Sequence, residues 1–65
     1  MRKNLKKARQ RAGMTQKEVA KYLGITTRSY QRIENGERTG EIETWDLLED
    51  KFGITQRVLR ELSTN

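Results

Sequence analysis

The sequence contains no cysteine, no histidine and no proline among its 65 residues. Without cysteine it can form neither disulfides nor thiolate metal sites, and without histidine the usual zinc, nucleophile-base and proton-shuttle arrangements cannot be assembled. We therefore expect neither an enzyme nor a bound cofactor. A chain of this length has room for one small domain, so residues 1–65 are assigned to a single domain.

Long apolar runs are also missing, because hydrophobic residues make up only 32% of the chain. No stretch is long enough for the apolar part of a signal peptide or for a membrane span, and the chain opens directly with Met1, Arg2 and Lys3. We expect a soluble, cytoplasmic protein without a membrane partner. Because no ligand pocket is readable in so small a core, no small-molecule effector is expected either.

Positive charge is concentrated in the first part of the chain. Residues 1–40 contain eleven Lys or Arg against three Glu, a net charge of +8, whereas residues 41–65 contain three against six acidic residues, a net charge of −3. A basic face indicates a nucleic-acid partner, since each neutralised phosphate releases bound counterions. The alternative is that the charged residues, 35% of the chain, only solvate a small helical protein.

Apolar residues recur at helical spacing in five segments, and no segment has the alternation of a strand. The expected helices cover residues 3–12, 16–23, 26–34, 41–52 and 55–62, which predicts an all-α, compact five-helix domain. The predicted core consists of the inward positions of these helices and of their connections: Leu5, Ala8, Met14, Val19, Ala20, Leu23, Ile25, Tyr30, Ile33, Ile42, Trp45, Leu48, Phe52, Ile54, Val58 and Leu59. Residues 63–65 are expected to fray.

Residues 16–35 are expected to form two short helices joined by a tight turn at Gly24. Thr15 can cap the first helix, with Glu18 as its capping-box partner, and Gly24 can adopt the left-handed conformation that ends it. In the second helix Tyr30 and Ile33 face inward. The outward positions are polar and mostly cationic: Thr27, Arg28, Gln31 and Arg32. A helix that offers donors, braced by a preceding helix, is what reading a DNA major groove requires.

Individual side chains of this unit allow more than one interpretation. Arg28 and Arg32 lie one turn apart and could each donate two hydrogen bonds to a guanine, or they could be ordinary solvated cations. Thr27 could meet a base edge or could merely cap its helix. Arg9 lies at the edge of an apolar stripe, so a partly covered guanidinium there needs a partner, for which Glu34 is the candidate.

Seven short motifs together resemble the lambda-repressor-like helix-turn-helix family, which includes lambdoid phage repressors, Cro proteins and many bacterial regulators and antitoxins. The similarity covers about residues 3–62. The motifs are Leu5-x-x-x-Arg9, Gly13-Met14-Thr15-Gln16, Val19-Ala20, Leu23-Gly24-Ile25, Ser29, Ile33-Glu34-Asn35-Gly36 and Phe52-Gly53-Ile54. The resemblance implies a DNA-binding domain that works as a dimer on a two-fold symmetric operator, with its third helix in the major groove.

The resemblance also implies roles for single residues. Base edges would be read by Thr27, Arg28 and Arg32. Flanking contacts, mostly to phosphate, would come from Thr26, Ser29 and Gln31, and contacts to the DNA backbone would come from Gln16, Asn35 and Arg38. Gln16 could alternatively be an ordinary first-turn residue. Arg9 and Glu34 match the family's salt-bridged pair.

The chain departs from the family at a few positions. Tyr30 stands where the family generally has Ile or Val, so its ring is expected in the core with its hydroxyl at the surface, toward a phosphate. Two acidic residues, Glu37 and Glu41, flank the loop after the third helix. Gln56 and Arg57 replace more apolar residues that some relatives use to dimerise.

These observations predict a sequence-specific regulator of transcription that binds double-stranded DNA, of phage or bacterial type. It would be a repressor bound to a palindromic operator as a homodimer, in the bacterial cytoplasm or nucleoid or, for a phage protein, in the host cell. The alternative is an antitoxin-like or anti-regulator interaction module whose acidic C-terminal half binds another protein, with DNA binding secondary. The off-stripe Leu47 favours that alternative, and either Leu47 or Trp45 could lie at a subunit contact. RNA is a third candidate, weakened by the lack of an aromatic stacking platform.

Overall fold

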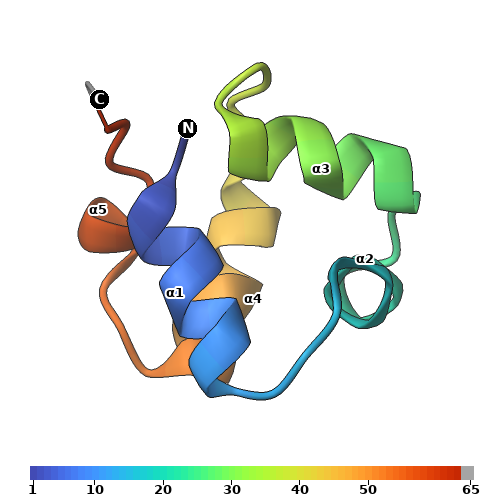
Figure 1. Ribbon diagram of the computed structural model, residues 1–65, viewed down its shortest axis with the longest axis horizontal. Coiled ribbons are helices and arrows are strands. Elements are labelled where there is room, and N and C mark those ends of the chain that lie inside the picture. Colours follow the sequence, from blue (N-terminus) through green and yellow to red (C-terminus); the bar gives the residue numbers. More distant parts are fainter. Residues whose placement is uncertain (64–65) are drawn as a thin grey trace.

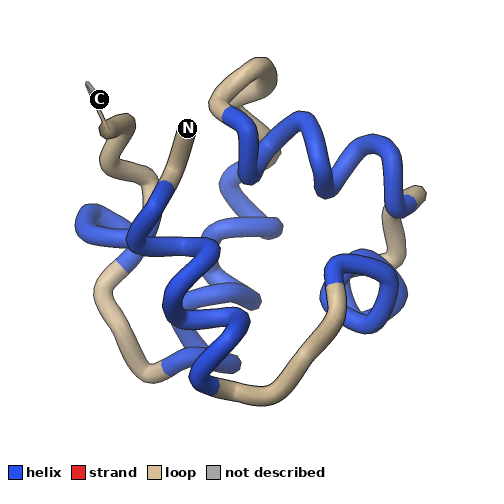
Figure 2. The backbone as a smooth tube through the Cα atoms, viewed as in Figure 1, coloured by secondary structure: helices blue, strands red, loops and turns tan. Residues whose placement is uncertain are grey.

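A computed structural model of the chain describes residues 1–63, which form helices and connecting loops without any strand. The helices are α1 (Lys3–Arg11), α2 (Gln16–Leu23), α3 (Thr27–Asn35), α4 (Ile42–Phe52) and α5 (Gln56–Leu59). Figure 1 shows α5 and α2 at opposite sides of the molecule, with α3 along one edge. Short loops join the helices (Figure 2). The predicted all-α, five-helix fold is confirmed.

Local hydrogen bonds fix both ends of α2. The Thr15 hydroxyl oxygen accepts from the Glu18 N–H at 3.1 Å, and the Glu18 carboxylate accepts from the Thr15 N–H at 2.9 Å. At the other end Gly24 has φ +73°, and the N–H of Ile25 donates to the Ala20 carbonyl at 3.0 Å. This bond pairs a carbonyl that the helix itself leaves free, and it turns the chain sharply toward α3. The predicted capping box and glycine turn both form.

The core gathers apolar side chains from all five helices. The buried members are Leu5, Ala8, Val19, Ala20, Tyr30, Ile33, Trp45, Leu48 and Leu59. Partly buried residues pack against them: Met14, Leu23, Ile25, Phe52 and Ile54. All of these were predicted: Met14, Ile25 and Ile54 as inward residues of the connections, and the others as inward residues of the helices.

Two predicted core residues are wrong. Ile42 is 75% exposed and Val58 is 42% exposed. Ile42 is the first residue of α4, where a side chain tilts beyond the helix end and meets no neighbouring turn. Val58 lies on the outer side of the single turn of α5, whose Leu59 faces the core instead. Thr44, which was not predicted, is buried in α4.

Trp45 belongs to the core, with 1% of its surface exposed. Its indole N–H donates to the Thr39 carbonyl at 2.7 Å, so the polar edge of the ring is satisfied inside the protein. The alternative in which Trp45 is exposed at a subunit contact is therefore wrong. Leu47 is 36% exposed and stays available at the surface.

The chain after α5 differs from the prediction. The last helix ends at Leu59 rather than near Leu62, and Leu62 is 54% exposed. Contrary to the fraying predicted for it, Ser63 is tied to the start of the chain, since its N–H donates to the Met1 carbonyl at 2.8 Å. This bond joins the two ends of the described chain. The fraying predicted for Thr64 and Asn65 lies outside the described residues.

Candidate nucleic-acid interface

Helix α3 has two chemically different faces. Tyr30, Ile33 and Glu34 are buried against the rest of the protein. The opposite face carries four exposed residues that the sequence assigned to DNA contacts: Arg28, Gln31, Arg32 and Asn35. These four side chains line one surface hollow of about 190 Å³ together with Glu37 from the following loop. The hollow thus brings two guanidinium groups, two amides and one carboxylate side by side.

The start of α3 is fixed by hydroxyl groups. Thr26 is the N-cap, and its hydroxyl oxygen accepts from the Ser29 N–H at 3.0 Å. The same hydroxyl donates to the Ser29 Oγ at 2.9 Å, and Arg38 donates a longer bond to that Oγ at 3.5 Å. Thr27 is the first helical residue rather than the cap, which corrects the interpretation of Thr27 as a capping residue. Its hydroxyl makes no hydrogen bond within residues 1–63, so it is available to a partner.

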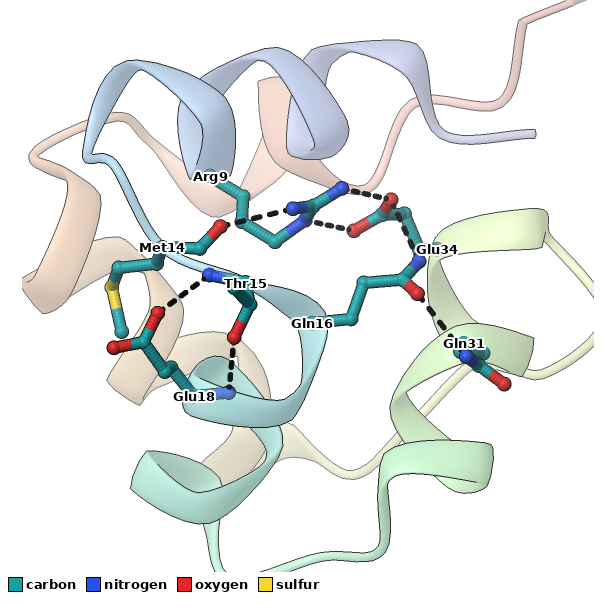
Figure 3. Close-up of polar contacts among 7 residues, drawn as sticks. All are labelled: Arg9, Met14, Thr15, Gln16, Glu18, Gln31 and Glu34. Carbon is teal, nitrogen blue, oxygen red and sulfur yellow. Dashed lines mark hydrogen bonds and ion pairs between the residues drawn. The ribbon is translucent and has the colours of Figure 1, made fainter.

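A chain of polar contacts connects α1, α2 and α3 (Figure 3). Arg9 binds the Glu34 carboxylate through two nitrogens, at 2.9 and 3.0 Å, and donates to the Met14 carbonyl at 2.9 Å. The Gln16 amide donates to Glu34 at 3.2 Å and accepts from the Gln31 amide at 3.2 Å. The predicted Arg9–Glu34 ion pair therefore forms, and Gln16 links it to the exposed face of α3. Gln16 is more than an ordinary first-turn residue.

This cluster is ionised at neutral pH. Burial of Glu34 by itself opposes the charged form, but hydrogen bonds, first of all from Arg9, outweigh it and lower the pKa of Glu34 below its usual value. The same hydrogen bond to Glu34 raises the pKa of Arg9. A bidentate, shielded pair of this kind has one preferred geometry. The pair thereby sets the orientation of α3 relative to α1.

The ring of Tyr30 lies in the core as predicted, but its hydroxyl does not reach the surface. The residue is fully buried, and its hydroxyl finds no hydrogen-bond partner of good geometry among residues 1–63. The hydroxyl lies near the Arg9–Glu34 pair instead of at the surface. Burial, and after it the neighbouring Glu34 carboxylate, raise the pKa of Tyr30 far above its usual value. Tyr30 therefore cannot contact a phosphate in this conformation, because its ring fills the interior behind α3.

Arg2 is a structural residue that the sequence analysis missed. It is 5% exposed, and its guanidinium donates to the carbonyls of Ile33 at 2.6 Å, Arg38 at 2.8 Å and Arg60 at 3.0 Å. It also lies 5.2 Å from the centre of the Trp45 ring. One side chain therefore holds the end of α3, the following loop and the segment after α5. A basic residue ahead of a helix gives no sequence signal for such burial.

The loop after α3 carries the last two candidate contacts. Gly36, with φ +86°, ends the helix directly after Asn35, and the Glu37 N–H donates to the Arg32 carbonyl at 2.8 Å. The Arg38 side chain is exposed while its backbone carbonyl is held by Arg2. Asn35 thus lines the hollow on the α3 face, and Arg38 lies in the loop after it, where Arg2 holds its backbone carbonyl.

Neither a metal-binding cluster nor a membrane-spanning helix is found in the part of the chain that the structure describes. Nowhere in residues 1–63 do three or more Asp, Glu, His or Cys side chains come together as a metal site would need. In the same range, no helix has the length and apolar character needed to cross a membrane.

A helix-turn-helix family model matches residues 5–62, which is nearly the whole chain. Comparison with curated proteins and with solved structures gave no significant match. The matched range includes the capped α2, the Gly24 turn, α3 and the Arg9–Glu34 pair. The chain therefore belongs to the lambda-repressor-like helix-turn-helix family of DNA-binding transcription regulators.

Proposed function

We propose that the protein is a repressor that binds a palindromic operator as a homodimer, with α3 of each copy in a major groove. The exposed face of α3 carries this proposal. Arg28 and Arg32 lie one turn apart in the same hollow, and each guanidinium can donate two hydrogen bonds to the O6 and N7 of a guanine. Thr27 has a free hydroxyl and a methyl group that fits beside the methyl of a thymine.

Contacts to the DNA backbone are proposed around the rim of this face. Polar residues with neutral or positive side chains surround the base-reading residues: Gln16, Thr26, Ser29, Gln31, Asn35 and Arg38. Such contacts fix the position of a protein on the duplex without reading sequence. The net charge of +8 on residues 1–40 supports the same proposal, because it attracts the duplex before specific contacts form.

A second copy of the chain is proposed to complete the DNA-bound form. Ile42 is 75% exposed at the start of α4, directly after the loop that carries Arg38, and it gives this region an uncovered apolar side chain. Two copies related by a two-fold axis would place their α3 helices about 34 Å apart, which is one turn of the duplex.

Selection of bound sequences from a random duplex pool tests this function. The expected result is a palindrome whose half-sites are centred about one helical turn apart. A single enriched half-site without symmetry would contradict the homodimer and leave sequence reading intact. Absence of any enriched sequence would contradict the function as a whole.

A protein-interaction module is the second candidate. Leu47 is 36% exposed on α4, and the acidic residues Glu43, Asp46 and Asp50 on the same helix are also exposed. A partner with a basic rim around an apolar pocket would fit this helix. The Leu47→Glu variant tests the candidate: loss of a co-purified partner with unchanged DNA affinity would support it, whereas loss of operator binding alone would contradict it.

A further inference from the structure

A second basic surface lies away from the exposed face of α3. It is an open surface hollow of about 570 Å³ between the start of α1, the loop before α4 and the segment around α5. Three arginines line it, Arg2, Arg57 and Arg60, and among residues 1–63 Glu61 is the only acidic residue in its wall. We call this hollow the arginine pocket. In Figure 1 the N-terminus, the loop after α3 and the C-terminal segment lie along one edge of the molecule.

The guanidinium of Arg2, which lines the pocket, does not use all of its hydrogen-bond donors within the described part of the protein. Its Nε and Nη1 donate to three backbone carbonyls, but its Nη2 donates no hydrogen bond within residues 1–63. No carboxylate in that range pairs with Arg2, since the only ion pair there joins Arg9 to Glu34. A buried cation that is held only by carbonyls and an aromatic face favours the approach of an anion.

The neighbouring arginine increases this positive potential. Arg60 lies 5.9 Å from the centre of the Trp45 ring, and Arg2 lies 5.2 Å from the same centre. Burial, and after it the charge of Arg60, lower the pKa of Arg2. Burial removes hydration from the charged form and Arg60 repels it, and an anion between the two groups would relieve this repulsion.

Glu61 does not neutralise the pocket. Its carboxylate accepts a long hydrogen bond from the Asn4 amide at 3.5 Å and forms no ion pair within residues 1–63. Three arginines against one glutamate leave a net charge of +2 on the wall. A phosphate group offers several acceptor oxygens to guanidinium forks, and it carries a charge of about −1 as a diester of the DNA backbone and about −1.5 to −2 as a monoester, so it matches this wall better than a single carboxylate does.

We propose that the arginine pocket binds a phosphate group, at a site separate from the exposed face of α3. Two sources share this chemistry. One is a backbone phosphate of the bound duplex, because Thr39, next to Arg38 in the loop after α3, also lines the pocket. The other is a small phosphorylated molecule that binds independently of DNA.

Trp45 provides a direct readout, because it is the only tryptophan of the chain and its ring lies beside both Arg2 and Arg60. Inorganic phosphate, titrated against chloride at constant ionic strength, should change the Trp45 fluorescence in a saturable manner. The double variant Arg57→Gln/Arg60→Gln should lose the saturable change. Both residues are exposed, so the variant should fold; Arg2 is left in place because the fold depends on it.

The matched control is Lys3→Gln/Lys7→Gln, which removes the same charge from exposed positions of α1 and should keep the saturable change. The salt dependence of duplex binding distinguishes the two possible sources of the phosphate. If it is a DNA phosphate, the slope of log K against log salt should fall by about 0.9 for each lost contact beyond the change seen in the control. If it is a free molecule, the two double variants should have equal slopes.

Two results together would overturn the proposal. The first is that phosphate causes no saturable change in Trp45 fluorescence, or causes the same change in both double variants. The second is that the two double variants have equal slopes of log K against log salt for duplex binding. In that case the arginine pocket has no specific phosphate site. The fluorescence titration contains no DNA, so it can succeed even if the proposed repressor function is wrong, and it can fail while operator binding stands.

Discussion

Two charged side chains are buried in this small fold, and the protein stabilises them in different ways. Glu34 is compensated by the Arg9 guanidinium and the Gln16 amide, whereas Arg2 is compensated by three backbone carbonyls and the face of Trp45. A buried charge that loses its partners is costly, because its desolvation is no longer offset. Both residues should therefore contribute more to stability than the many exposed charges.

Replacement of Glu34 by Gln should destabilise the protein by about 3 kcal/mol at neutral pH, because Arg9 would stay charged and partly shielded without its carboxylate. Urea denaturation followed by circular dichroism measures this change. Glu37→Gln is the matched control on the exposed loop and should alter the free energy of unfolding by less than about 0.5 kcal/mol. Equal effects of the two substitutions would contradict the structural role of the ion pair.

The same carboxylate predicts a pH dependence. Because the pKa of Glu34 is lower in the folded than in the unfolded protein, its contribution is complete above the unfolded value of about 4.3 and is lost as the pH falls through the folded value. The stability difference between the native protein and Glu34→Gln should therefore shrink in acid. Parallel stability curves for the two proteins from pH 7 to pH 3 would disprove this assignment.

Arg2→Met should destabilise the protein by about 3 kcal/mol, since the carbonyls of Ile33, Arg38 and Arg60 would lose a charged donor. The exposed neighbour provides the control, because Lys3→Met should be nearly neutral. Thermal unfolding of both variants gives the comparison. A neutral effect of Arg2→Met would show that the three hydrogen bonds do not hold the ends together.

The difference between these residues explains what could be predicted from sequence. Arg9 and Glu34 were paired correctly because both lie at helical positions beside the apolar stripe and because the resemblance gives the same pair. Arg2 was missed because its acceptors are backbone carbonyls 31, 36 and 58 residues away. Backbone acceptors exist at every position, so no residue type marks them in advance.

At the scale of elements, the turns that end α2 and α3 use the same conformation in different surroundings. Gly24 and Gly36 have φ values of +73° and +86°. A β-carbon at Gly24 would meet nothing within 4 Å, but one at Gly36 would lie 3.0 Å from the Leu62 side chain and 3.1 Å from the Met1 nitrogen. At Gly24 a glycine is required only by the backbone conformation. At Gly36 it is required also because a β-carbon would lie too close to its neighbours.

Gly24→Ala should therefore cost about 1 kcal/mol, the usual penalty for the left-handed conformation. Gly36→Ala should cost clearly more, about 2 to 3 kcal/mol, because Met1 and Leu62 must also move. Chemical denaturation of the two variants side by side makes the test. Equal losses would mean that the contacts of the two chain ends with Gly36 are not tight.

The success of prediction also varies between elements. Helices α1 to α3 were placed within one residue because a capping box and well-spaced glycines mark their ends. The bounds of α4 were also placed within one residue, although the burial of Ile42 was wrong, whereas α5 ends three residues earlier than predicted. The single turn of α5 is too short for periodicity to separate an inward from an outward residue, and Val58 was assigned to the wrong side. Ile42 was wrongly predicted to be buried, because it lies at the start of a helix, where the path of the preceding chain decides which side chains are buried.

At the scale of the whole molecule, the buried charges, the glycine turns and the hydroxyl cap all position one exposed face. Arg9, Glu34 and Gln16 join three helices behind α3, while Arg2 fixes the loop at its end. The backbone under this surface is held by hydrogen bonds, and the two arginine side chains of α3 are exposed. This arrangement suits selective hydrogen bonding, because little backbone freedom is lost when a partner binds.

The central claim is that the exposed face of α3 reads base sequence, and Arg32→Ala tests it most directly. Affinity should be measured on the selected operator and on a scrambled duplex at one salt concentration, with Arg11→Ala as an exposed control of equal charge change. We predict that Arg32→Ala weakens operator binding by about 1 to 3 kcal/mol and scrambled binding far less, while Arg11→Ala weakens both slightly and equally. Equal losses on the two duplexes for Arg32→Ala would contradict base reading by this face.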